Sequence, residues 1–396
     1  MPVGESSANE GWEMSPELTA LRDTVRRFME REVKPLEDTL PHDSFVPPPE
    51  ALAKLRAKAR ALGLWCIQSP AEFGGAGLSV LAQCIVAEEA SKCRMGAYFP
   101  ACGAFGADPP LVIFKGTKEQ IERYGKPAVE TGETTFVAIS EPGGGSDPGR
   151  SIRTKAERKG NVYVLNGSKL WISGVDRARW GLLFARAEGS KGRSGITSFI
   201  VDTDRPGISW QKVNVMRSYS PFEVHLDNYE LPIENRLGEE GEGFALAQKW
   251  LVHARIPYAS TSIGMAQAAL DLAIEWARNR EAFGSRLADK QAIQWMLADS
   301  EIELRAARML TYQAAWKADR DEDPKIEASI AKVYSTEASF RVLDRCMQIF
   351  GGMGMTHELP LERWFREARI RRIGEGPSEV HRMVIARELI GSGRRT

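Results

Sequence analysis

The spacing of apolar residues along the chain changes twice, and each change marks a change in the predicted structure. From residue 15 to about 132, apolar positions recur at steps of three and four, which is typical of helices packed on one face. Ser15-Pro16-Glu17 has the form of an N-cap followed by a first-turn proline and acid, and Thr117 and Gln120 are spaced as a capping box. We predict an N-terminal helical domain over residues 1–133.

Between residues 134 and 239 the period becomes two. The runs 134–139, 162–165 and 196–201 predict strands, and Lys159-Gly160 and Asn166-Gly167 lie between them as turn signals. We expect Asn166-Gly167 to form a two-residue hairpin. Because no strand–helix–strand alternation and no G-x-G-x-x-G motif after a strand are found, we do not expect a nicotinamide-binding Rossmann unit. The pattern predicts a mostly antiparallel β domain.

Helical patterns return from residue 243 and fill a third predicted domain, 240–396. The runs 263–280, 287–318 and 326–350 are rich in helix-forming residues. Small residues gather in the first run and predict close contacts between helices of a bundle: Ala266, Ala268, Ala269 and Ala273. The order helical, β, helical indicates an α+β fold.

Composition narrows the class of protein. Lysine plus arginine equals aspartate plus glutamate at 53 each, and 43% of the residues are hydrophobic, as in an ordinary globular protein. We therefore expect neither nucleic acid nor a membrane as a partner, and no apolar run is long enough for a bilayer. The basic stretch Arg363, Arg366 and Arg369 has acids interleaved and predicts a salt-bridged helix. The acidic stretch 1–14 predicts neither a secretion signal nor a transit peptide.

The cysteines and histidines show no metal-ligand or disulfide pattern. The five cysteines are odd in number and contain no C-x-x-C pair, which favours a reducing, cytoplasmic location. The histidines lack spacings such as H-x-x-x-H, so we expect no metal; those considered are His42, His225, His357 and His381.

Two short motifs carry candidate chemistry. Glu375 lies between Gly374 and Gly376, so a carboxylate with little bulk beside it could face a flat ligand as a base. The alternative is that Gly374 is a left-handed helix cap and Glu375 an ordinary surface residue. In the second motif, 140–147, three glycines expose backbone N–H groups that could cradle a phosphate or a heteroaromatic edge.

Taken together, the motifs resemble those of the acyl-CoA dehydrogenase family along nearly the whole chain. The resemblance implies a helical bundle, a barrel-like β domain and a four-helix bundle, with FAD held at the dimer interface of a homotetramer that is a dimer of dimers. The motifs that carry it, in order, are Pro70-Ala71-Glu72-Phe73-Gly74-Gly75, Ser140-Glu141-Pro142-Gly143-Gly144-Gly145-Ser146-Asp147, Trp171-Ile172-Ser173, Asn235-Arg236-Leu237-Gly238 with Gly241-Glu242-Gly243-Phe244, Arg280-Glu281-Ala282-Phe283-Gly284, Gln348-Ile349-Phe350-Gly351-Gly352, Arg366-Glu367-Ala368-Arg369 and Glu375-Gly376.

The resemblance also assigns roles by position. Glu375 is the catalytic base, which removes the α-proton of an acyl-CoA thioester while a β-hydride passes to flavin N5 and trans-2-enoyl-CoA forms. Ser146, Arg255 and Gly376 are assigned to the substrate. The FAD set is Ser140, Gly145, Ser146, Trp171, Ile172, Ser173, Pro377 and Glu379, with Arg280, Phe283, Gln291, Gln348, Gly351 and Gly352 from a neighbouring subunit. An electron-transfer flavoprotein is the implied electron acceptor.

Several positions depart from, or compete with, the family pattern. Some members carry the base one residue before Arg255, but Ala254 cannot act as one. Gly374 stands where a tyrosine is common, which predicts a wider acyl pocket. Pro377 replaces a usual threonine, and Val252 stands where an aspartate often contacts CoA.

Two other functions share the same motifs. An acyl-CoA oxidase of this fold would pass its electrons to oxygen. A flavin-containing DNA-binding relative would keep a vestigial site, but the zero net charge and the intact Glu375 oppose this alternative.

Overall fold

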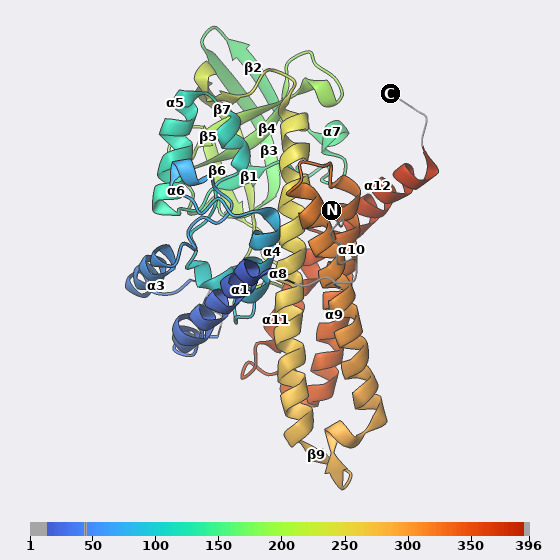
Figure 1. Cartoon of the computed structure of the whole chain (residues 1–396). Helices are drawn as coiled ribbons and strands as arrows, with labels where there is room; N and C mark the ends of the chain where they lie inside the picture. The colour runs from blue at the N-terminus through green and yellow to red at the C-terminus, as the bar shows by residue number, and fades with distance from the viewer. Residues whose placement is uncertain (1–13, 43, 45, 392–396) are drawn as a thin grey trace, which may run out of the picture.

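The computed structural model describes residues 14–42, 44 and 46–391, and the chain runs from helices through a sheet to helices again (Figure 1). Residues 1–13, on which the expectation of no targeting signal rests, lie outside the described part. The helices are α1 (Pro16–Phe28), α2 (Lys34–Glu37), α3 (Pro49–Ala61), α4 (Val80–Ala90), α5 (Lys118–Gln120), α6 (Lys126–Thr131), α7 (Pro148–Ser151), α8 (Gly243–Asn279), α9 (Gln291–Ala318), α10 (Lys325–Phe350), α11 (Leu361–Arg371) and α12 (Ser378–Ile390).

Local capping signals begin two of the N-terminal helices where the sequence predicts. The Ser15 hydroxyl accepts a hydrogen bond from the Leu18 N–H at 3.3 Å, and Pro16 occupies the first turn of α1. Thr117 and Gln120 form the predicted reciprocal capping box of α5. Both predictions are confirmed.

The central sheet has the strand order β6-β7-β3-β2-β4-β5-β8, with β1 paired to β4. Its pairs are antiparallel except β1 with β4 and β2 with β4, so the prediction of a mostly antiparallel domain is confirmed. The strands are β1 (Phe136–Ala138), β2 (Lys155–Lys159), β3 (Val162–Ile172), β4 (Trp180–Ala187), β5 (Ile196–Asp202), β6 (Ile208–Lys212), β7 (Phe222–Pro232) and β8 (Arg236–Leu237); a separate pair is β9 (Glu281–Ala282) with β10 (Ser285–Arg286).

The predicted hairpin at Asn166-Gly167 is wrong, because both residues lie inside β3. The register of β3 against β7 shifts between Leu165 and Gly167, which marks a bulge. A Cβ at Gly167 would lie 2.7 Å from Thr154 Cα, so the glycine permits a close backbone approach. The turn between β2 and β3 instead uses Gly160, at φ 60°.

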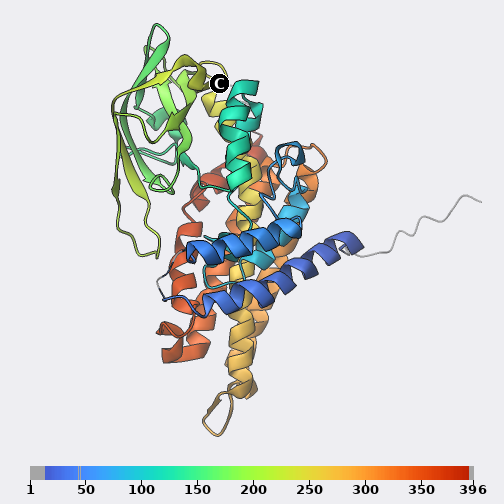
Figure 2. The same cartoon turned by 90° about the vertical axis from the view of Figure 1, so that its left-hand side faces the viewer.

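The C-terminal helices α8, α9 and α10 run side by side in a long bundle, and α8 reaches up to the sheet (Figures 1 and 2). Ala266, Ala269 and Ala273 are completely buried, as their small size predicts. Gly264 brings α8 onto α4, since a Cβ there would lie 1.9 Å from the Glu88 carbonyl oxygen. Among the described helices we find none with the length and apolar character that a membrane span requires.

Candidate active site

Glu375 lies in the short connection between α11 and α12, and its backbone is left-handed at φ 56°. This conformation costs a non-glycine residue about 1–2 kcal/mol and is concentrated at functional sites. Gly376 follows at φ 96°, whereas Gly374 is not among the glycines with positive φ. The alternative interpretation of Gly374 as a left-handed cap is therefore wrong, and the acid itself occupies the strained position.

Three basic side chains hold the backbone of this connection. Arg255 Nε donates to the Glu375 carbonyl oxygen at 2.9 Å, and His381 Nε2 lies 3.2 Å from the same oxygen. Lys332 Nζ donates to the Gly376 carbonyl oxygen at 2.6 Å. Meanwhile Oε2 of the Glu375 carboxylate is buried and makes no hydrogen bond within the described protein. The backbone is thus fixed while one acid oxygen is left for a ligand.

Burial lowers the pKa values of two of these side chains, Lys332 and His381. Burial, and then the positive charge of Arg371, lower the pKa of Lys332 to about 7. Burial, and then the charge of Arg255, lower the pKa of His381 to about 3. His381 is therefore neutral at pH 7 and holds the loop as a hydrogen-bonding group rather than as a charge.

Tyr258 of α8 fills the space beside Gly374. A Cβ at Gly374 would lie 2.9 Å from the Tyr258 hydroxyl oxygen, and the Arg371 guanidinium lies 3.1 Å from the centre of the Tyr258 ring. The expected widening of the pocket at Gly374 is not seen at this point, because a phenol from another helix takes the place of a side chain on the loop.

A cleft of about 1440 Å³ lies between the sheet, α8 and α12, and is larger than an ordinary small-molecule pocket of ~300–1,000 Å³. It brings together four of the residues assigned from sequence: Ser146, Arg255, Pro377 and Glu379. Val252 and His381 line it as well. Glu375 is not in the lining, but Arg255 and His381, which hold its carbonyl, border the cleft.

A buried ion pair anchors the glycine-rich loop. Lys169 Nζ lies 2.8 Å from Glu141 Oε1, and both side chains are almost fully buried. The Glu141 carboxylate also accepts hydrogen bonds from the Arg153 N–H and from the N–H and hydroxyl of Thr154. The Leu170 N–H donates to the Ser140 carbonyl at 2.9 Å, so the loop starts beside the segment that carries Trp171.

The three residues after Leu170 differ in what they offer a ligand. Trp171 is 55% exposed, although its side chain is a large indole, and its backbone has a positive φ of 66°. A strained backbone that presents an exposed ring fits a side chain that covers a flat ligand. The Ile172 side chain is buried in the core of the sheet, so only its backbone is available to a cofactor. Ser173 is half-buried and hydrogen-bonds Tyr98.

The residues assigned to a neighbouring subunit lie far from this cleft. Figure 1 shows β9, next to Arg280, at the end of the bundle that points away from the sheet. Arg280 lies 5.9 Å from the Trp276 ring, which stacks on Phe350 at 5.0 Å, so this segment adjoins the end of α10. Phe283 is 98% exposed at φ 54°. The others are also exposed: Gln291, Gln348, Gly351 and Gly352.

Sequence patterns did not identify Lys332 or Tyr258 as part of the site. Lys332 is completely buried in the middle of α10. A lysine among the small and apolar residues 328–333 was the available signal, since a lysine is almost never fully buried unless paired.

Comparisons with known proteins identify the family of this chain. Models of the acyl-CoA dehydrogenase N-terminal, middle and C-terminal domains match residues 15–132, 137–229 and 241–390. The pig short-chain specific acyl-CoA dehydrogenase, mitochondrial, is 38% identical over 94% of this chain and 90% of its own. The caffeyl-CoA reductase-Etf complex subunit CarC of Acetobacterium woodii is 36% identical over 93% and 97%.

Solved structures give the same result. Butyryl-CoA dehydrogenase from Megasphaera elsdenii superposes with a TM-score of 0.85 at 30% identity, covering 96% of this chain and 100% of the other. The chain therefore belongs to the acyl-CoA dehydrogenase family of flavin-dependent oxidoreductases.

Proposed function

We propose that the protein is an FAD-dependent acyl-CoA dehydrogenase that forms the α,β-double bond of a trans-2-enoyl-CoA. The observation that carries the proposal is Glu375, which combines a strained backbone, a fixed carbonyl and a buried carboxylate oxygen without a protein partner. Strain that the surroundings maintain is typical of catalytic positions. Ala254, the alternative position for the base, has no group that can take a proton.

The cofactor fits the residues that surround the cleft. Bound FAD supplies the hydride acceptor. Ser146, Pro377 and Glu379 line a cleft of sufficient size, and the exposed Trp171 stands beside the start of the glycine-rich loop. We assign Ser140, Gly145, Ser146, Trp171, Ser173, Pro377 and Glu379 to its flavin end, with Ile172 contributing its backbone.

Glu375 performs the acid–base part of the reaction. Its carboxylate removes the α-proton of the thioester and carries it on one oxygen as the double bond forms. The Glu375 backbone N–H donates to the thioester oxygen, where charge develops, and one preorganised donor of this kind is worth about 3 kcal/mol. Arg255 and Gly376 lie next to this point and are assigned to the substrate.

The test is replacement of the base by its isosteric amide. Glu375→Gln should keep FAD and bind acyl-CoA but reduce its flavin at least ~100-fold more slowly, the lower end for a positioned base. Glu358→Gln, at an exposed acid in the same part of the chain, is the matched control and should react at the wild-type rate. Wild-type flavin bleaching by Glu375→Gln in anaerobic stopped-flow measurements would refute the assignment.

We also propose that electrons leave through an electron-transfer flavoprotein. The relative CarC is a subunit of a reductase-Etf complex, which supports such a partner. Exposing the acyl-CoA-reduced protein to air separates this proposal from the oxidase alternative, since a dehydrogenase should reoxidise slowly in air and quickly with the flavoprotein.

A homotetramer built as a dimer of dimers completes the proposed assembly, with FAD at the dimer interface. The residues assigned to the FAD adenosine end lie at the far end of the bundle, so one chain does not bring the two halves of the set together. In addition, α9 carries a row of exposed apolar side chains at intervals of seven, which is typical of a helix seam: Trp295, Ile302, Met309 and Trp316.

Domain boundaries at 133/134 and 239/240 complete the proposal. The first strand of the sheet begins at Phe136 and the long helix α8 at Gly243, which supports both boundaries.

The five cysteines are all buried free thiols, which supports a reducing compartment such as the cytoplasm.

A further inference from the structure

Two tyrosines from distant parts of the chain meet at the residues that follow β3. Tyr98 lies in the segment 93–102 after α4, and Tyr219 lies between β6 and β7. Their rings stack, with centroids 5.2 Å apart and planes 28° from parallel. Sequence patterns did not identify either tyrosine as part of the site, because only the fold brings the two rings together.

Each phenol hydroxyl holds one of the two residues that follow β3. The Tyr98 hydroxyl hydrogen-bonds the Ser173 side chain. The Gly174 N–H donates to the Tyr219 hydroxyl oxygen at 2.8 Å, and this hydroxyl in turn donates to Asp176 Oδ1 at 2.9 Å. The side chain of Ser173 and the backbone of Gly174 are therefore both tied to the stacked pair.

The two phenols keep their protons at neutral pH, because burial raises the pKa of Tyr98 and that of Tyr219. A protonated Tyr98 can donate to the Ser173 oxygen, and the Ser173 proton is then available for a ligand. Hydrogen bonds in such a chain polarise one another, so this arrangement also makes the serine a stronger donor.

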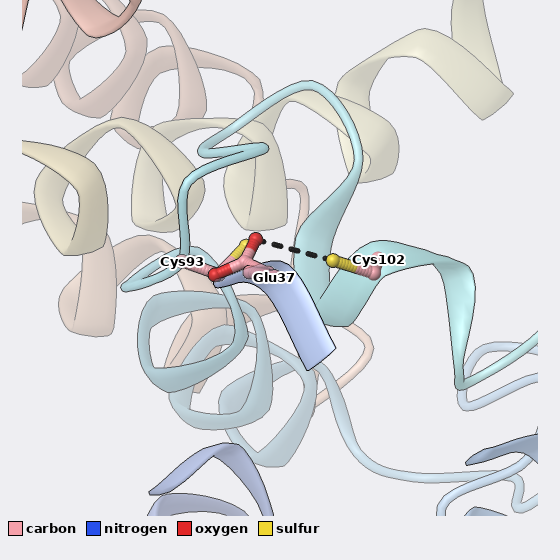
Figure 3. Close-up of side chains that lie close together, drawn as sticks. All are labelled: Glu37, Cys93 and Cys102. Carbon is pink, nitrogen blue, oxygen red and sulfur yellow. Dashed lines mark hydrogen bonds between the residues drawn. The ribbon is translucent and has the colours of Figure 1, made fainter. Parts of the chain in front are cut away.

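The segment 93–102 is itself fixed at both ends by one buried carboxylate. Figure 3 shows Cys102 directed at Glu37, and the Cys102 thiol donates to Glu37 Oε1 at 3.1 Å. The same carboxylate accepts hydrogen bonds from the Arg94 and Met95 N–H groups at 2.9 and 3.2 Å. The tyrosine in the middle of this segment is therefore presented by a closed and anchored loop.

Arg217 connects the stacked pair to α11. Its guanidinium lies 4.2 Å from the centre of the Tyr98 ring. Its Nε lies 3.0 Å from Oε2 of Glu367 on α11, in a pair whose side chains are only 9% and 3% exposed. Because α11 leads into the connection that carries Glu375, the residues after β3 and the candidate base are attached to the same buried group of side chains.

We propose that Tyr98 and Tyr219 are positioning residues that orient the Ser173 hydroxyl toward the flavin. The inference rests on the proposed function, in which Ser173 belongs to the flavin end of the FAD set. Tyr98 acts on the serine oxygen and Tyr219 on the adjoining backbone. A donor held at the flavin ring stabilises the negative charge that reduction adds to it, so the orientation of this hydroxyl should affect both the rate and the potential of flavin reduction.

The test compares Tyr98→Phe, Tyr219→Phe and Ser173→Ala in the FAD-loaded protein. Each tyrosine variant loses one hydroxyl and keeps the ring. The substrate is the member of a panel of straight-chain, branched and aromatic acyl-CoAs that bleaches the wild-type flavin fastest. Each variant should slow flavin reduction at least ~10-fold without weakening substrate binding, since a misplaced group at a reacting centre can cost ~100-fold.

The midpoint potential of the bound flavin gives a second measurement that needs no acyl-CoA. Reduction with a chemical reductant and an indicator dye should show a lower potential in Tyr98→Phe, Tyr219→Phe and Ser173→Ala than in the wild type. If the phenols act through the serine, adding either tyrosine change to Ser173→Ala should alter the rate and the potential no further.

Tyr229→Phe is the matched control. Tyr229 is buried, its hydroxyl donates to the Asp202 carbonyl at 2.9 Å, and it pairs with Leu165 in the first half of β3. This variant loses one buried hydrogen bond of the same sheet, so its melting temperature should fall as that of Tyr219→Phe does. Its rate and potential should stay at the wild-type values.

Three results would overturn the proposal: effects of the tyrosine changes that add fully to Ser173→Ala, wild-type rates and potentials in both tyrosine variants, or failure of both to fold. If only one of them fails to fold or to bind FAD, the other carries the comparison. Failure of the proposed function is a separate outcome, since the wild-type flavin would then not be bleached by acyl-CoA although the potentials could still be compared.

Discussion

Replacing Lys169 by methionine should remove the support of the glycine-rich loop. The change leaves the Glu141 carboxylate buried, with three neutral donors from Arg153 and Thr154 but no cation. Breaking a buried pair from one side costs about 3–5 kcal/mol, and the remaining donors place the expected loss near 3 kcal/mol. Because Glu141 lies inside the 140–147 motif, flavin should be lost as well.

The comparison needs an exposed pair on the same sheet. Lys159 and Glu157 on β2 lie 3.2 Å apart with more than 40% of each side chain exposed, so Lys159→Met should cost less than about 1 kcal/mol. Urea unfolding followed by tryptophan fluorescence, together with flavin absorbance after gel filtration, measures both effects. The double variant Lys169→Met/Glu141→Gln should recover much of the loss, since no unpaired charge remains.

One combination of results would contradict a supporting role of the Lys169–Glu141 ion pair. If Lys169→Met unfolds at the same urea concentration as Lys159→Met and retains its flavin, then the ion pair does not support the loop.

Two further predictions concern the C-terminal helices. Burial, and then the charge of Arg371, lower the pKa of Lys332 from 10.5 to about 7. Between these pH values the unfolded chain binds more protons than the folded protein, so the stability of the fold should rise with pH. Lys332→Gln keeps a donor for the Gly376 carbonyl but cannot titrate, so its melting temperature should not show this rise between pH 7 and 10. Ile302→Asp in the row of apolar residues on α9 should dissociate the proposed homotetramer, measured as a lower mass in light scattering, and an unchanged mass would contradict an interface at this row.

Local chemistry was predictable from sequence, whereas contacts between distant segments were not. The caps at Ser15 and Thr117 follow from residues three positions apart, so the sequence contains the whole interaction. Asn166-Gly167 has the local preference for a hairpin, but its glycine serves the approach of Thr154 instead.

The basic helix α11 shows the same division. The prediction of a salt-bridged helix is correct for Arg366, which pairs with Glu362 four positions away. It is wrong for Arg363, which is buried and donates to backbone carbonyls of His42 and Ser44. The helical period gives the face of a residue, but the tertiary partner decides whether that face meets solvent.

The contact between Tyr258 and Gly374 also constrains how this enzyme could evolve or be re-engineered. Because a side chain at 374 would meet the Tyr258 hydroxyl at 2.9 Å, the two positions share one volume. A mutant library that varies residue 374 alone should yield mostly folded variants with glycine at this position. A library that also places a smaller residue at position 258 should tolerate side chains at 374 that the single substitution does not. Acceptance of a new acyl group would then depend on the order of mutations, with the change on α8 coming first.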